Sequence, residues 1–315
     1  MMGWADGHCD VLYKLWQDGE GKLDFYSRNG NLDVNWPRAK DAKVRLQVFA
    51  IFVPPEVPRS QSWHVALQQV DDFYERVVQK GSRVCPVRSG EEIALLRQGD
   101  QMGGLLAMEG ADALQGNLSY LRLLYRLGVR QVGLTWNHAN EVADGIEEKR
   151  GGGLTRFGHH MVQEMDRLGM VLDVSHLSVR GFWDVMEYKI PVVASHSNAQ
   201  AICSHHRNLM DDQIRAVIQK EGLIGITFVP KFVHDHPEVA TVDCILKHIE
   251  YILSLGGKNH IAFGSDFDGI DQKIPGLEHI GDVCNLKEEL IKRYPEQWVR
   301  KWTEENWLDF YVRHL

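Results

Sequence analysis

The stretch MVLDVSHLSVRGFWDVMEYKIPVVASHSNAQAICSHHRN, residues 170–208, contains the same pattern twice. An apolar run ends in Ser-His at 175–176, and after one amphipathic segment a second apolar run ends in Ser-His at 195–196. This pattern predicts a strand, a crossover helix and a parallel strand. Because neighbouring parallel strands end at the same edge of a sheet, we expect His176 and His196 to lie close together. A single histidine there more often caps a strand, but the matched pair favours ligands of a cation such as Zn²⁺.

The overall composition is that of a folded globular protein without a general affinity for nucleic acids. The chain has 315 residues, of which 44% are hydrophobic and 25% charged, so it can form one large barrel or two ordinary domains. Its formal net charge is -8, from 43 acidic and 35 basic residues. A nucleic-acid binder would need a basic surface to neutralise phosphates, and this sequence has no basic stripe.

The cysteines and the amino terminus indicate the cellular compartment of the protein. The number of cysteines is odd and none forms a Cys-x-x-Cys pair, which disfavours both a disulfide framework and a structural zinc site. The amino terminus lacks a basic segment followed by an apolar one, and no apolar run approaches eighteen residues. We therefore expect a cytoplasmic protein with no membrane anchor. The five cysteines are Cys9, Cys85, Cys203, Cys244 and Cys284.

Eight apolar segments, nearly all alternating with helical ones, predict the fold. Strands are expected at 4–10, 44–53, 104–108, 129–135, 171–174, 191–194, 222–229 and 260–264. One helix is expected within 11–42 and one between 174 and 191. Further helices are expected at 62–79, 91–97, 118–127, 157–168, 211–220 and 242–255. This order over this length is typical of a (β/α)₈ TIM-type barrel. No linker or repeat divides the chain, so we expect a single catalytic domain over 1–315 that ends in helices at 284–295 and 296–313. An open doubly wound sheet is less favoured, because no Gly-x-Gly-x-x-Gly follows an early strand.

Candidate functional residues follow the carboxyl ends of these strands, where barrel enzymes have their active sites. Side chains alternate along a strand, so His8 and Asp10 point to the same side. Each signal is weak alone, and a carboxylate such as Glu109 after a strand is often a helix cap. Because all of these residues are expected at the same rim, the set as a whole indicates a functional site more specifically than any one of them. In chain order the candidates are His8, Asp10, Glu109, the segment 136–138, His176, His196 and Asp266.

Three of these histidines and two of these carboxylates are too many ligands for one catalytic zinc, which takes three protein ligands and a water. They suit two ions that share a bridge. We assign Glu109 as the bridge, His8 and Asp10 to one ion, and His176 and His196 to the other. Such a site carries positive charge, which lowers the pKa of a bridging water and makes hydroxide available at neutral pH. The same ligands also admit Mn²⁺, Co²⁺ or Fe²⁺.

Six segments of the chain resemble signature segments of the membrane (renal) dipeptidase family, zinc peptidases with an amidohydrolase-type barrel. The resemblance implies metal-dependent hydrolysis of dipeptides, including those with a carboxyl-terminal D-residue, at a binuclear zinc centre, by a homodimer. The missing secretion signal and lipid-anchor tail make the chain resemble the bacterial members. The segments, in the family's order, are DGHCD (6–10), EG (109–110), DVSH (173–176), SHS (195–197), HRN (206–208) and GSDFDG (264–269).

The same resemblance implies roles for three further residues. Asp266 would take the proton from the attacking water and pass it to the leaving amine, and Arg207 would hold the substrate's carboxylate. The family often has a histidine directly after the Leu-Thr of the fourth strand, where this chain has Trp136. Because positions 136 and 138 share a strand face, His138 is the candidate here for stabilising the oxyanion or contacting the substrate.

Two other functions remain open at this stage. A different metallohydrolase on the same barrel would cleave lactones, cyclic amides or phosphoesters, but such enzymes usually begin with His-x-His and bridge their metals through a carboxylated lysine. A relative that binds metal and ligand without turnover would have lost Asp266 or a metal ligand, and all are present. The polar segment 141–158 is either a lid over the strand ends or a charged surface loop.

Overall fold

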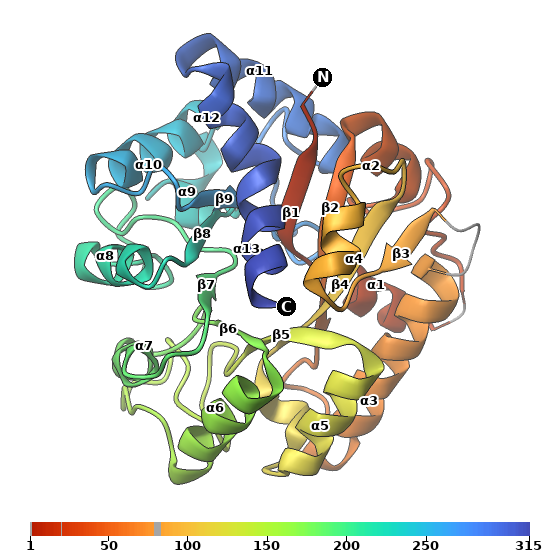
Figure 1. The fold of residues 1–315 in the computed structure, drawn as a ribbon, viewed down its shortest axis with the longest axis vertical. Coiled ribbons are helices and arrows are strands. Elements are labelled where there is room, and N and C mark those ends of the chain that lie inside the picture. Colours follow the sequence, from red (N-terminus) through yellow and green to blue (C-terminus); the bar gives the residue numbers. More distant parts are fainter. Residues whose placement is uncertain (1, 20, 79–82) are drawn as a thin grey trace.

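The computed structural model describes residues 2–19, 21–78 and 83–315, and its centre is a barrel of eight parallel strands (Figure 1). Each strand pairs with the next, and β1 approaches β9 through a bridge between Cys9 and Phe267. The predicted (β/α)₈ barrel is thereby confirmed as a nearly closed barrel. In order around it the strands are β1 Trp4–Cys9, β2 Val44–Phe52, β4 Met102–Glu109, β5 Val129–Gly133, β6 Val171–Asp173, β7 Val192–Ala194, β8 Leu223–Ile226 and β9 Ile261–Phe263.

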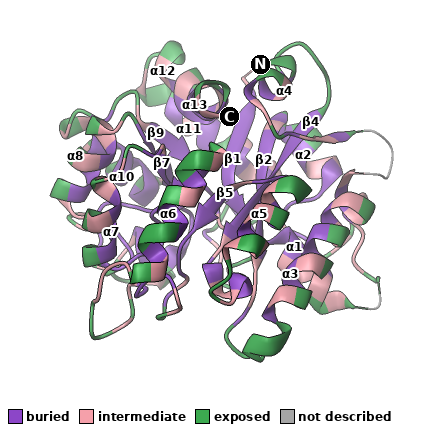
Figure 2. Ribbon diagram, turned by 60° about the horizontal axis from the view of Figure 1, so that its bottom comes forward, coloured by how far each residue is buried: buried purple, intermediate pink, exposed green. Residues whose placement is uncertain are grey.

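Helices cover the outside of the barrel, with their buried faces toward the strands and their exposed faces outward (Figure 2). Most helical segments begin or end within a few residues of the expected positions. The α-helices are α1 Val11–Asp18, α2 Trp36–Ala42, α3 Arg59–Asp72, α4 Gly90–Leu95, α5 Leu118–Leu127, α6 Arg156–Leu168, α7 Val179–Met186, α8 Asp211–Gln219, α9 Pro230–Val233, α10 Val242–Ser254, α11 Val283–Arg293, α12 Glu296–Arg300 and α13 Asn306–His314.

Three elements differ from the sequence expectation. The segment 11–42, expected to hold one helix, holds both α1 and α2. The strand β3, Val84–Pro86, pairs with β4 outside the barrel and was not predicted, because three residues ending in proline give no alternating pattern. The helix expected at 62–79 begins at Arg59 and continues beyond Asp72 as a π-helix over Phe73–Val78; its expected last residue lies outside the described residues.

The last helix, α13, closes the core at the amino ends of the strands (Figure 1). Its Trp307 is fully buried, and the indole Nε1 donates to the backbone oxygen of Phe263 at 2.8 Å. The rings of Trp307 and Tyr311 stack with centroids 5.5 Å apart. Side chains of α13 therefore fill the barrel at this end, opposite the carboxyl ends that carry the candidate residues. Within the described ranges no helix is long and apolar enough to cross a membrane.

Candidate metal centre

The five predicted ligands and Asp266 come from the ends of five strands and lie together at one rim of the barrel. Glu109 is the last residue of β4, and the others belong to β1 or to the turns directly after β1, β6, β7 and β9. All six are buried or nearly so. These residues lie together because the strands are parallel, so the carboxyl ends of all of them lie at the same rim of the barrel.

Two histidines and one carboxylate oxygen form a tight triangle. The Nε2 atoms of His176 and His196 are 2.8 Å apart. The Oε1 atom of Glu109 lies 2.9 Å from Nε2 of His176 and 3.5 Å from Nε2 of His196. Three ligand atoms of the kinds that zinc prefers therefore converge on one point.

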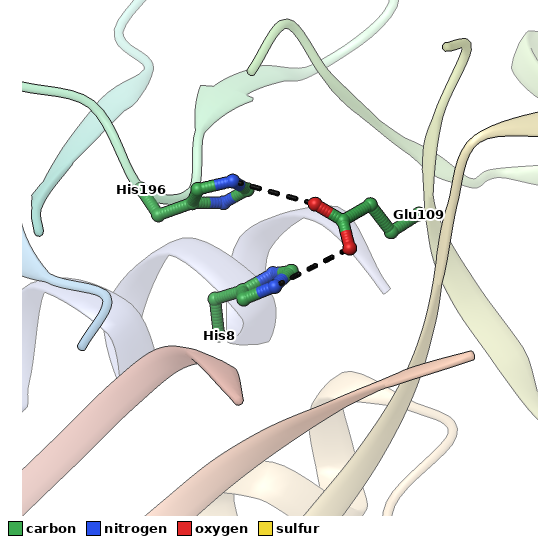
Figure 3. A group of neighbouring side chains, drawn as sticks. All are labelled: His8, Glu109 and His196. Carbon is green, nitrogen blue, oxygen red and sulfur yellow. Dashed lines mark ion pairs between the residues drawn. The ribbon is translucent and has the colours of Figure 1, made fainter. Parts of the chain in front are cut away.

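The other oxygen of Glu109 faces a second group. Its Oε2 atom lies 3.8 Å from Nε2 of His8, so one oxygen of this carboxylate faces His196 and the other faces His8 (Figure 3). The rings of His8 and His196 lie beside each other, with centroids 4.0 Å apart. Nε2 of His8 is also 3.4 Å from Oδ2 of Asp10 and 3.9 Å from Oδ1 of Asp266. The ligand atoms of His8, Asp10 and Asp266 all lie within 4.8 Å of one another. Asp266 therefore lies directly beside the predicted ligands His8 and Asp10.

Asn137, which lies in the candidate segment 136–138 but was given no role of its own, orients His176. The Nδ1 atom of His176 lies 2.6 Å from the side-chain oxygen of Asn137. An amide oxygen only accepts, so Nδ1 carries the proton and Nε2 presents its lone pair to Glu109. A buried amide oxygen in this place holds the ring as the second partner of a metal-ligating histidine usually does. Asn137 lies in the loop beyond the end of β5, where the sequence shows no periodicity from which its contact with His176 could have been predicted.

His196 is oriented in the same way through Ser195. The single hydroxyl proton of Ser195 is donated to Oδ2 of Asp173, so Oγ accepts from Nδ1 of His196 at 2.7 Å. The Nε2 atom of His196 therefore also presents a lone pair, and it faces the lone pair of His176 at 2.8 Å. Two such lone pairs repel each other unless a cation lies near both.

Buried atoms without hydrogen-bond partners indicate that cations fit between these residues. Nε2 of His8 and Oδ1 of Asp10 are buried without a hydrogen-bond partner in the part of the chain that the structure describes. Burying a polar atom without a partner costs free energy, which a bound cation would remove. Imidazole and carboxylate together are a donor set that suits zinc and its neighbours among the divalent metals.

Burial and neighbouring charges shift the pKa values of the site residues. Burial raises the pKa of Glu109 to about 8 and that of Asp266 to about 6. Burial acts to lower the pKa of His8, but the charges of Glu109, Asp10 and Asp266 together raise it to about 10. Burial lowers the pKa of His176 and of His196 well below the usual value, which favours the neutral ring, the form that binds metal.

Two of the site residues have a backbone conformation that is rare for residues other than glycine. His176 has φ 67° and Asp266 has φ 66°, in the left-handed region. Backbone hydrogen bonds fix both: Ile146 N–H donates to the oxygen of His176 at 2.7 Å, and Asp266 N–H to the oxygen of His8 at 3.2 Å. Strain of this kind persists where the surroundings determine the conformation, which is common at functional sites.

Arg207 lies beside the cluster in the segment after β7. Its side chain is buried, with the residue 4% exposed, and Nη2 donates to the backbone oxygen of His196 at 3.3 Å. Its Nε has no hydrogen-bond partner among the described residues. Burial lowers the pKa of Arg207 to about 10, although the charges of Asp266 and Glu109 act to raise it. A buried guanidinium whose Nε has no partner among the described residues thus lies beside the predicted metal ligands.

The structure does not bring His138 to the metal ligands. Its side chain is exposed, and its ring lies 5.9 Å from that of Trp136, at right angles. It is Trp136 whose ring approaches His176, with centroids 6.1 Å apart. The reason is that β5 ends at Gly133, so the strand alternation on which the expectation for His138 depended does not extend to position 138.

The polar segment 141–158 is held against the site by hydrogen bonds. Ala143 bridges Leu154 in antiparallel fashion, and Arg150 pairs with Asp144. The N–H of Glu147 donates to the backbone oxygen of Asn137 at 2.8 Å. The segment therefore forms a wall beside His176 and Asn137.

The role of Asn137 leads to a first prediction. Replacing Asn137 with alanine removes the acceptor that holds the His176 ring, so metal affinity should fall by about 10–100-fold, the usual effect of losing such a partner. Competition with a chelator of known affinity measures this. Asn259→Ala, at an exposed position, is the control and should bind metal like the wild type. Equal affinity in Asn137→Ala and wild type would contradict the assigned role.

Comparisons with known proteins agree with this architecture. The sequence model of a family described as membrane dipeptidase (peptidase family M19) matches residues 2–311. Dipeptidase aclJ of Aspergillus oryzae is 31% identical over 311 residues, which cover 92% of this chain and 72% of that protein. A metallo peptidase from Rhodobacter sphaeroides, liganded with a phosphinate mimic of the dipeptide L-Ala-D-Ala, has a TM-score of 0.94 at 26% identity, covering 100% of this chain and 99% of that one. The solved dipeptidase AC has a TM-score of 0.93 at 26% identity, covering 99% of both chains.

Proposed function

The chain belongs to the membrane dipeptidase family (peptidase family M19), and from this premise we propose that it hydrolyses dipeptides, including those with a carboxyl-terminal D-residue, at a centre of two zinc ions. That it is a metallo-dipeptidase follows from the family. The observation that carries the two-ion proposal is the placement of Glu109, whose oxygens face different groups of ligands. The D-residue is supported by the Rhodobacter sphaeroides relative, which is liganded with a mimic of L-Ala-D-Ala.

The five ligands divide between two positions. His8 and Asp10 would hold one ion, His176 and His196 the other, and Glu109 would bridge them. Two zinc ions bound there would lower the pKa of a water and polarise the scissile carbonyl. The protein's own contribution is to present unprotonated imidazole nitrogens, which the contacts of His176 with Asn137 and of His196 with Ser195 achieve. Mn²⁺, Co²⁺ and Fe²⁺ suit the same ligands.

Asp266 is the residue we propose for proton transfer. Its carboxylate lies at the edge of the ligand cluster, 3.9 Å from Nε2 of His8, and its side chain is 15% exposed, so it can meet both a water and the substrate. It would accept a proton on a carboxylate oxygen and later deliver it to the leaving amine nitrogen. Burial raises its pKa to about 6, which brings its two protonation states closer in free energy near neutral pH.

Arg207 is the residue we propose for binding the substrate's carboxylate. A buried guanidinium with a free donor forms a charge-assisted pair with a carboxylate, and it would place the amide bond of a dipeptide next to the metal ligands. A longer peptide would have to place its carboxylate elsewhere. This selects substrates with a single amide bond.

A substitution of Arg207 tests that role. Arg207→Gln should raise KM for a dipeptide about 10–100-fold, the value of one charge-assisted hydrogen-bond pair. A dipeptide amide has no carboxylate, so the wild type should use it poorly and the substitution should lower its kcat/KM no further. Steady-state kinetics with both substrates measure the difference. Equal losses for the dipeptide and its amide would contradict carboxylate binding by Arg207.

The function as a whole is tested by metal analysis together with a panel of L-Xaa–D-Xaa dipeptides. We expect about two metal ions per chain and hydrolysis that stops after exhaustive chelation and returns with Zn²⁺. A chelated and reconstituted sample of the same preparation is the control for irreversible damage. Undiminished hydrolysis after chelation would overturn the metal-dependent mechanism, and one ion per fully active chain would overturn the two-ion centre.

We also propose that the protein is a cytoplasmic homodimer. The dimer rests on the family resemblance, and light scattering on the purified protein tests it. The compartment is supported by the cysteines, since all five are free thiols. Fractionation of cells followed by an activity assay tests the compartment.

A further inference from the structure

The barrel closes where residues 6–10 of its first strand meet residues 265–267 after its last strand, a contact that we call the seam. Within the described ranges, ladder pairs join every other pair of neighbouring strands, whereas β1 and β9 have no ladder and Cys9 forms a bridge with Phe267 just beyond β9. The backbone hydrogen bonds across the seam include Asp266 N–H to the oxygen of His8 at 3.2 Å and Asp10 N–H to that of Phe267 at 2.9 Å. The seam thus separates the ligands of one proposed metal position from the residue proposed for proton transfer.

A buried carboxylate joins the two sides of the seam. Oδ1 of Asp6, on β1, accepts from the backbone N–H of Ser265 at 2.8 Å, and Oδ2 accepts from the hydroxyl of Ser265 at 2.6 Å. Both residues are fully buried. A carboxylate that accepts from the N–H and the O–H of one residue fixes both its position and its orientation. Since Ser265 directly precedes Asp266, Asp6 holds the peptide that leads into Asp266.

Asp266 needs such support for two reasons. Its backbone has φ 66°, in the left-handed region, which costs free energy for a residue other than glycine. Its ligand atom also lies within 4.8 Å of those of His8 and Asp10, and two carboxylates so close together repel each other. Both effects would move Asp266 out of its place if Ser265 were free to shift.

The same aspartate–serine contact occurs a second time at the rim. Oδ1 of Asp173, on β6, accepts from the N–H of Ser195 at 2.9 Å, and Oδ2 accepts from its hydroxyl. Ser195 directly precedes the predicted metal ligand His196, so in both places the serine lies just before a site residue. There, however, β6 and β7 are also joined by ladder pairs, such as Asp173 with Val193. At the seam the aspartate carries a larger share of the connection.

Close packing beside the seam leaves little room for adjustment. A Cβ atom at Gly7 would lie 2.2 Å from Cζ2 of Trp307, and one at Gly264 would lie 1.8 Å from the backbone oxygen of Ser195. The chain on each side of the seam therefore packs directly against its neighbours. Because closely packed regions transmit displacements, a shift at the aspartate–serine contact should reach Asp266.

We propose that Asp6 is a positioning residue, an inference that rests on the proposed function: by holding Ser265 across the seam, it keeps Asp266 where its carboxylate can exchange a proton with the attacking water. Asp6 acts through Asp266, so its loss should lower kcat and leave the metal content and KM for a dipeptide nearly unchanged. A displacement of about 1 Å at a reacting group can cost about 10²-fold in rate.

A double-mutant cycle tests this role. Turnover of L-Ala–D-Ala is measured in the zinc-loaded wild type, in Asp6→Ala, in Asp266→Asn and in the chain with both substitutions. Asp6→Ala should lower kcat about 10–100-fold and change KM less than about 2-fold. In the Asp266→Asn background it should cost no more than about 2-fold further, because residues that act as one unit are not additive. A merely structural role would act equally in both backgrounds.

Two further variants complete the experiment. Ser265→Ala removes the hydroxyl and leaves β1 intact; it should show the same pattern with a loss of about 10-fold, and it decides the matter if Asp6→Ala does not fold. Asp41→Ala is the matched control, since it removes an exposed carboxylate of α2 and should leave kcat unchanged. Circular dichroism and metal content show which variants are folded and loaded.

The outcomes separate the two proposals. Equal losses of kcat in both backgrounds, or an unchanged kcat in folded, metal-loaded Asp6→Ala, would overturn the positioning role and leave the dipeptidase proposal standing. Loss of a metal ion from Asp6→Ala would overturn it as well, because Asp6 would then hold His8 and not Asp266. A zinc-loaded wild type that hydrolyses no dipeptide would overturn the proposed function, and the positioning role with it.

Discussion

Asp266→Asn should lower kcat for dipeptide hydrolysis by about 10²–10⁴-fold while the metal ions stay bound, the range expected when a general acid–base group is lost. Asparagine has nearly the same shape as aspartate, so the packing around Oδ1, 3.9 Å from Nε2 of His8, is kept. The amide cannot accept a proton from water or return one to the amine. Steady-state kinetics and metal analysis on the same sample measure both parts of this prediction.

Asp271→Asn is a matched control, since Asp271 is exposed in the same loop and should tolerate the change. An unchanged turnover in Asp266→Asn would refute its role in proton transfer. Loss of metal together with activity would instead make Asp266 a metal ligand, a result its place within 4.8 Å of the ligand atoms of His8 and Asp10 would then explain.

Glu109→Gln should lose metal from both positions and lower activity by a factor on the order of 10³ or more. The substitution replaces one ligand oxygen by an amide nitrogen, which does not bind zinc, and removes the negative charge that the two positions share. In the wild type, zinc should raise the melting temperature, because it binds the folded chain; in Glu109→Gln this shift should be much smaller. Metal analysis, activity and thermal unfolding with and without zinc measure these effects.

The control for Glu109→Gln is Glu187→Gln, an exposed position after α7. It should keep the metal content, activity and zinc-dependent melting temperature of the wild type. Two ions per chain and full activity in Glu109→Gln would contradict the bridging role. Loss of one ion only would assign Glu109 to a single position.

The barrel itself could be predicted because each of its strands is short, apolar and followed by a turn signal. The runs at 171–174 and 191–194 were expected as strands and appear as β6 and β7. The prediction missed β3, which is an edge strand of three residues outside the barrel. It also expected a single helix within 11–42, where the structure has both α1 and α2. The single-domain organisation over 1–315 stays a prediction.

At the site, residues on or next to strands were predictable and residues farther into the loops were not. The parallel ends of β6 and β7 bring His176 and His196 to the distance expected of neighbouring ligands. His138 was placed by extending the strand alternation past Gly133, where the strand has ended, and Trp136 is the residue that reaches the cluster. The role of Asn137 depends on a contact between residues 39 positions apart, for which a single sequence carries no signal.

The barrel and the candidate metal ligands could be predicted from the amino-acid sequence alone, because apolar periodicity and the placement of His, Asp and Glu at strand ends are local properties of the chain. The folded chain alone shows that the two oxygens of Glu109 face different histidines and that Asn137 and Ser195 set the ring orientations. Those features depend on where loops from distant strands meet. The closure of the barrel and the packing of the loops against one another determine where these loops come into contact.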